Sequence, residues 1–126
     1  MDTFSLLNKT RGVTPAIPFA KIKDAALGKT YDLSVVLLTP AEARRVTLAS
    51  KHIDKASNVL SFPLSSESGE IFLCPATART QAREYGYTHH QFIAHLFIHG
   101  LLHLKGFDHS DTMDNEEGRI ATLFGF

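Results

Sequence analysis

The chain has 126 residues, 44% of them hydrophobic, which is enough for a single domain with one core over residues 1–126. Its one cysteine, Cys74, excludes an internal disulfide and a cysteine-rich zinc site. The formal net charge is +0, but the charges are unevenly distributed along the chain. Residues 1–58 contain nine Lys/Arg and five Asp/Glu, whereas residues 59–126 contain four Lys/Arg and eight Asp/Glu.

The basic part of the chain can form a face that meets a polyanion, although ordinary surface charges give the same count. The N-terminus lacks the basic start and apolar block of a signal peptide, and apolar runs such as residues 35–38 are too short to span a membrane. We therefore expect a cytoplasmic protein without a membrane-spanning segment.

Apolar stretches rich in β-branched residues predict strands at residues 31–38, 58–62 and 70–74. Pro40 follows the first stretch and suits the first position of a helix over residues 41–50. Pro63 is expected to stop the second strand. The absence of repeats and long linkers in the sequence places these elements in one compact unit.

A helix over residues 88–105 is the strongest prediction in the sequence. Thr88 can cap its N-terminus while Gln91 reaches back in a capping box, and Gly106 can adopt the left-handed conformation that ends a helix. Apolar residues cover most of its circumference, so the helix should be largely buried. Two shorter helices are expected beside it, at residues 77–85 and 111–124.

Three histidines, His99, His103 and His109, have the spacing of metal ligands. Residues four apart on a helix lie on one side, so His99 and His103 can face one ion, and a turn at Gly106 lets His109 fold back towards them. Three nitrogen ligands leave a fourth position open to water, as in catalytic zinc sites. A lone histidine is better explained by a hydrogen bond, but three at this spacing predict one Zn²⁺ per chain.

Other residues near this motif have more than one interpretation. Helix-borne sites of the form H-E-x-x-H belong to metallopeptidases, but position 100 is glycine, so the peptidase base is missing and a packed neighbour or a substrate should approach Gly100 closely. Asp108 can orient a ligand histidine or take a proton from water at the metal. His95 can orient a ligand, face the substrate or be a buried, hydrogen-bonded residue. We expect the remaining histidines at the surface, namely His52, His89 and His90.

These motifs resemble those of the YbeY family of bacterial endoribonucleases, also called ribosomal RNA maturation factors. Residues Ser57–Pro63, S-N-V-L-S-F-P, are similar to the family's T-[DN]-V-L-S-F-P. Residues His95–His109 are similar to its H-L-x-V-H-G-x-L-H-L-x-G-Y-D-H, and Gly69–Cys74 to its G-D-I-x-I-[CS] strand. The resemblance runs in order from about residue 50 to 110, and the N-terminal part is similar only in its expected layout.

The resemblance implies a single α+β domain with a mixed sheet of about four strands, flanked by helices, and a zincin-like metal helix with zinc on the three histidines. It implies cleavage of single-stranded RNA in the maturation of the 3′ end of small-subunit ribosomal RNA and in ribosome quality control, with ribosomal RNA and the small ribosomal subunit as partners. The family's functional arginine falls at Lys51 and its aspartate at Glu70. Lysine keeps the positive charge but cannot bind a phosphate in the two-pronged manner of arginine.

Our hypothesis for the reaction gives Lys51 the task of neutralising the phosphate, with Asp108 and His95 as the other catalytic candidates. The attacking group is either water or the ribose 2′-hydroxyl, and only the second must leave a cyclic phosphate. One alternative is a ribosome-associated assembly factor in which the metal holds the C-terminal segment and no RNA is cleaved. A second is a metal-dependent hydrolase of a small molecule or peptide. The sequence leaves the oligomeric state open.

Overall fold

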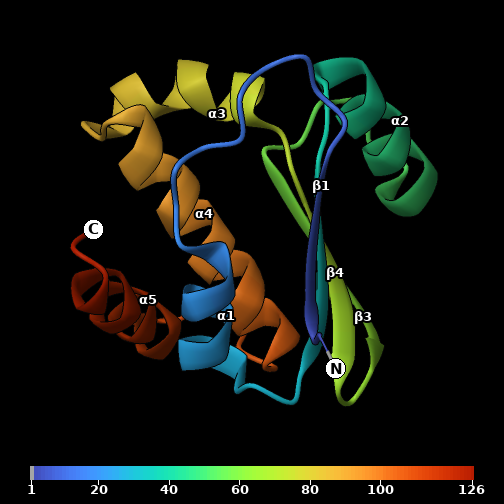
Figure 1. Ribbon diagram of the computed structural model, residues 1–126. Coiled ribbons are helices and arrows are strands. Elements are labelled where there is room, and N and C mark those ends of the chain that lie inside the picture. The colour runs from blue at the N-terminus through green and yellow to red at the C-terminus, as the bar shows by residue number, and fades with distance from the viewer. Residues whose placement is uncertain (1) are drawn as a thin grey trace.

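The computed structural model describes residues 2–126 as one α+β domain built on a four-stranded mixed sheet (Figure 1). The sheet has the order β1-β2-β4-β3, in which β1, β2 and β4 are parallel and β3 is antiparallel to β4. The predicted fold class is therefore confirmed. The strands are β1 (Phe4–Asn8), β2 (Asp32–Leu37), β3 (Val59–Ser65) and β4 (Ser68–Leu73).

The helices cover the two faces of the sheet unequally (Figure 1). Helix α2 packs on one face over a small apolar cluster, whereas α1, α3, α4 and α5 enclose the main core on the other face. Among residues 2–126, no helix is both long enough and apolar enough to cross a membrane. The helices are α1 (Phe19–Leu27), α2 (Pro40–Lys51), α3 (Pro75–Ala82), α4 (His89–Leu104) and α5 (Asp111–Leu123), with a 3₁₀ turn η1 (Arg83–Tyr85) between α3 and α4.

Helix α4 lies at the centre of the main core and has the ends that the sequence predicts. The Thr88 hydroxyl accepts a hydrogen bond from the backbone N–H of Gln91, and the Gln91 side chain accepts one from the backbone N–H of Thr88. Gly106 has a φ of 102°, which ends the helix and turns the chain. Phe97 is fully buried and packs edge-on against Phe19 of α1, so α4 is held from several sides.

Two parts of the fold differ from the sequence-based expectation. Pro63 does not end β3, which continues to Ser65 with an irregular register between these two residues. An edge strand tolerates proline because one side of its backbone is free of ladder hydrogen bonds. The elements β1 and α1 were not predicted; both are short, at five and nine residues.

Gly69 on β4 sets the distance between the sheet and the end of α4. A Cβ atom at Gly69 would lie 2.5 Å from Tyr31 Oη and 3.0 Å from Leu104 Cδ2. We expect Gly69→Ala to lower the free energy of unfolding by about 1–3 kcal/mol through overpacking. Gly118 on α5 is the matched control: a Cβ there meets nothing within 4 Å, so Gly118→Ala should raise the free energy by up to about 1 kcal/mol. Urea unfolding measures both, and equal midpoints for Gly69→Ala and the wild type would contradict the prediction.

Candidate metal centre

The structure brings His99, His103 and His109 together at the C-terminal end of α4. The first two lie one turn apart on α4, and His109 lies in the segment between α4 and α5. One ring nitrogen from each histidine lies within 4.8 Å of the other two, which is the arrangement of a group that can hold one metal ion. His99 and His103 are partly buried and His109 is exposed, so the cluster is open on the His109 side.

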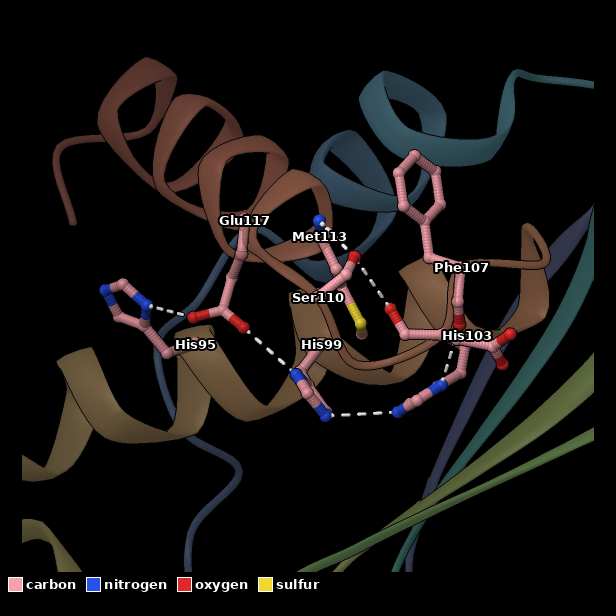
Figure 2. Close-up of polar contacts among 8 residues, drawn as sticks. His95, His99, His103, Phe107, Ser110, Met113 and Glu117 are labelled. Atoms are coloured by element: carbon pink, nitrogen blue, oxygen red, sulfur yellow. Dashed lines mark hydrogen bonds and ion pairs between the residues drawn. The ribbon is translucent and has the colours of Figure 1, made fainter.

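Hydrogen bonds on the far side of each ring select one tautomer for two of these histidines (Figure 2). His99 Nδ1 lies 3.1 Å from a carboxylate oxygen of Glu117, and His103 Nδ1 lies 3.1 Å from the backbone carbonyl of Phe107. Both partners only accept hydrogen bonds, so each Nδ1 carries the proton and donates it. The two Nε2 atoms are therefore left with free lone pairs.

The two Nε2 atoms face each other at a distance of 3.1 Å (Figure 2). Two lone pairs at this distance repel each other unless a cation or a proton lies between them. Ligands about 2.1 Å from a tetrahedral metal are about 3.4 Å apart, close to the observed separation. Burial and the nearby His99 also lower the pKa of His103, which favours the neutral imidazole that a metal binds. The donor set therefore fits a transition metal such as zinc.

Glu117 on α5 is the functional residue that the sequence analysis missed. Its two carboxylate oxygens accept hydrogen bonds from His95 Nδ1 at 3.0 Å and His99 Nδ1 at 3.1 Å (Figure 2). Burial alone would raise the pKa of Glu117, but these hydrogen bonds lower it to about 2. The hydrogen bond to Glu117 in turn raises the pKa of His95. A signal was present, because Glu117 shares the buried face of α5 with Met113 and Ile120 at helical spacing.

The other predicted residues lie around the cluster in different settings. His95 is partly buried, and its second ring nitrogen lies 3.4 Å from the backbone carbonyl of Phe126, which favours a hydrogen-bonded, orienting histidine. Asp108 is exposed, and a hydrogen bond from the Ser110 hydroxyl reaches only its backbone carbonyl. Any catalytic task of Asp108 therefore stays a prediction.

Gly100 on α4 lies against the sheet and is closely packed. A Cβ atom there would lie 3.2 Å from the side chain of Ile71 and 3.3 Å from that of Val59. The close approach that a glycine at this position predicts is confirmed, and the approaching groups are packed side chains of β4 and β3. The predicted surface position holds for His52 and His90, which are exposed. It is wrong for His89, which is partly buried and whose Nδ1 is fully buried.

Three cavities meet beside the histidines at Val59 on β3. The first, of about 360 Å³, is lined by all three histidines together with Lys51 from the end of α2. The second, of about 310 Å³, continues from Lys51 to Lys55. The third, of about 370 Å³, is lined by His99 and aromatic side chains of α4 and the segment before it. The three cavities share Val59, and we call them together the histidine groove, which has a basic part at Lys51 and Lys55 and an aromatic part beside His99.

The sheet order, the buried central helix and the histidine cluster define a small α+β protein with a candidate metal centre on α4. The family model described as Endoribonuclease YbeY matches residues 9–122. The chain therefore belongs to the YbeY endoribonuclease family, as its motifs indicate.

Relatives and one solved structure agree with this assignment. Endoribonuclease YbeY from Neisseria meningitidis serogroup B is 34% identical over 142 aligned residues, which cover 98% of this chain and 84% of the relative. Endoribonuclease YbeY from Sulfurimonas denitrificans is 39% identical over 100 residues, 74% of this chain and 72% of the relative. The solution structure of TM1509 from Thermotoga maritima superimposes with a TM-score of 0.69 at 25% identity, covering 94% of this chain and 86% of that one.

Proposed function

We propose that the chain is a zinc-dependent endoribonuclease that cuts single-stranded RNA, with one Zn²⁺ held by His99, His103 and His109. Its cellular task is the maturation of the 3′ end of small-subunit ribosomal RNA and ribosome quality control in the cytoplasm. The observation that carries the proposal is the cavity that joins the three histidines to Lys51. The names of the relatives, which are endoribonucleases, support RNA as the substrate.

The residues of the chain have separable tasks in this mechanism. Zinc, when bound, supplies Lewis-acid chemistry at the phosphate and lowers the pKa of water. Glu117 and the Phe107 carbonyl hold His99 and His103 in the tautomers that present Nε2. Lys51 lines the same cavity, and its ammonium neutralises a phosphate oxygen as a point charge.

We assign His95 a positioning task and Asp108 the task of proton acceptor. Both ring nitrogens of His95 have acceptor partners, Glu117 and Phe126, so this histidine acts through Glu117 on the orientation of His99. Asp108 lies in the turn next to His109, and its exposed carboxylate is available to solvent and substrate.

A ribosome-associated assembly factor without cleavage activity is the second candidate. The observation that favours it is the connection between α4 and α5: His109 precedes α5 and Glu117 lies on it, so a metal on the cluster would hold the C-terminal helix to the core. Such a task requires metal binding and no chemistry.

The deciding experiment offers labelled single-stranded RNA, duplex RNA and DNA of the same sequence to pure protein with added zinc. We expect cleavage of the single-stranded RNA alone.

In Lys51→Ala, loss of one phosphate contact should raise the KM about tenfold and reduce the salt dependence of binding by about one charge. Lys51→Arg should keep the wild-type KM or lower it, because its fork suits phosphate better.

Lys21→Ala is the matched control, since Lys21 is an exposed lysine on α1 and lines none of the three cavities of the histidine groove.

Equal cleavage of DNA would exclude attack by the 2′-hydroxyl. Stoichiometric zinc binding without RNA cleavage under any salt condition would reject the nuclease and leave the assembly factor.

A further inference from the structure

An aromatic cavity opens directly beside His99 and shares Asn58 and Val59 with the cavity that contains Lys51 and Lys55. It has a volume of about 370 Å³, and its walls combine aromatic rings with a few polar side chains. The lining residues are Asn58, Val59, Tyr85, Tyr87, Phe92, His95, Leu96, His99 and Glu117.

The rings in this cavity are arranged as near-parallel plates. Tyr85 stacks on Phe92 with ring centroids 5.5 Å apart and an interplanar angle of 15°. Tyr87 stacks on His95 at 4.8 Å and 26°, and also lies near Phe92 at 6.1 Å and 28°. Hydrogen bonds from His95 to Glu117 and Phe126 fix the imidazole ring under Tyr87, so this ring is held in place before any ligand binds.

Both tyrosines of this cavity are exposed at the surface. The exposed fractions are 66% for Tyr85 and 36% for Tyr87, while Phe92 beneath them is buried. Exposed aromatic faces beside a candidate RNA-cleaving site are typical of surfaces that stack unpaired bases.

Charge separates this cavity from the rest of the groove. Among the described residues, those that line the aromatic cavity include no Lys or Arg, whereas the neighbouring cavity contains Lys51 and Lys55. Glu117 makes the aromatic end unfavourable for a phosphate. Asn58, whose Nδ2 donates to Gln81 Oε1 at 2.6 Å, adds an amide at the wall shared with the basic cavity. The cavity therefore suits a neutral, planar, partly polar group.

We propose that the aromatic cavity binds one unpaired nucleobase of the RNA strand, adjacent to the phosphate that lies between Lys51 and the histidines. The base stacks on Tyr85 and Tyr87, and its sugar-phosphate backbone passes Val59, where the cavities meet. This inference rests on the proposed function and adds a reason for single-strand preference, because a base held in a duplex cannot enter the cavity.

The test measures RNA binding in the absence of metal, so that no strand is cut. Fluorescence anisotropy of a labelled single-stranded RNA in EDTA is compared for the wild type, Tyr85→Ala, Tyr87→Ala and Tyr87→Phe. We expect each alanine variant to raise the Kd about tenfold, as loss of one stacking ring does, and Tyr87→Phe to bind within about twofold of the wild type. Leu7→Ala is the control, since Leu7 is 58% exposed on β1, at the opposite edge of the sheet.

A second measurement needs no variant. RNA that carries 2-aminopurine at successive positions should lose fluorescence on binding at one position only, where the base stacks. Wild-type Kd values in both alanine variants, or equal fluorescence at every position, would overturn the inference. Cleavage by the wild type with zinc is measured in parallel: cleavage with no effect of the tyrosines rejects the cavity alone, whereas tyrosine-dependent binding without cleavage rejects the nuclease and keeps the cavity.

Discussion

The variant His103→Ala is expected to lose its metal ion and, with it, RNA cleavage. His103 supplies one of three nitrogens, and its Nε2 lies 3.1 Å from that of His99, so its removal leaves two ligands and an open cluster. Loss of an outer partner of a metal ligand costs about 10–100-fold in affinity, and loss of a ligand itself should cost more. Metal content of the purified protein, measured by mass spectrometry, should fall from about one ion per chain to near zero.

His90→Ala is the matched control for this experiment. His90 is an exposed histidine on the first turn of the same helix and lies outside the cluster. It should keep full metal content and full cleavage. Circular dichroism should show the same helix content for both variants. Full metal content in His103→Ala would contradict the three-histidine site.

The variant Glu117→Gln is expected to bind zinc about 10–100-fold more weakly than the wild type while keeping its fold. Glutamine has the size of glutamate but no charge, and it offers one acceptor oxygen where the carboxylate offers two. In the position of Glu117, its one acceptor oxygen would serve either His95 or His99, whereas Glu117 accepts from each histidine through a separate oxygen. The affinity is measured by competition with a zinc chelator, so the result does not depend on cleavage.

Glu116→Gln tests whether any acidic residue of α5 has this effect. Glu116 precedes Glu117 in the chain but forms an ion pair with Arg119, and within residues 2–126 it accepts no hydrogen bond from a histidine. We expect wild-type zinc affinity in this variant. Equal affinity for Glu117→Gln and Glu116→Gln would mean that the carboxylate does not orient His99.

The parts of the site that could be predicted are those set by spacing along one helix. His99 and His103 are four residues apart, and the capping pair Thr88 and Gln91 is three apart, so the helix itself determines both arrangements. The glycine at position 106 indicates where the helix ends, which makes the return of His109 foreseeable.

The parts that could not be predicted depend on the packing of separate elements. Glu117 is 18 residues from His99 in the chain, and only the docking of α5 on α4 brings the two together. The aromatic cavity combines β3 with residues before and within α4, so no spacing in the sequence reveals it. Lys51 was located by the family resemblance alone, and its place in the cavity follows from where α2 ends.

The two walls of the cavity beside the histidine cluster come from different parts of the chain. His95, the three histidines and Glu117 belong to one helical hairpin, in which the two residues of the His95–Glu117 contact are 22 positions apart. Closing so short a segment costs little chain entropy. The opposite wall, at Lys51 and Val59, comes from earlier elements. On the proposed function, a substitution at Lys51 can therefore change substrate binding without removing a metal ligand, whereas a substitution at Val59 also acts on the hairpin, because Val59 packs against Gly100.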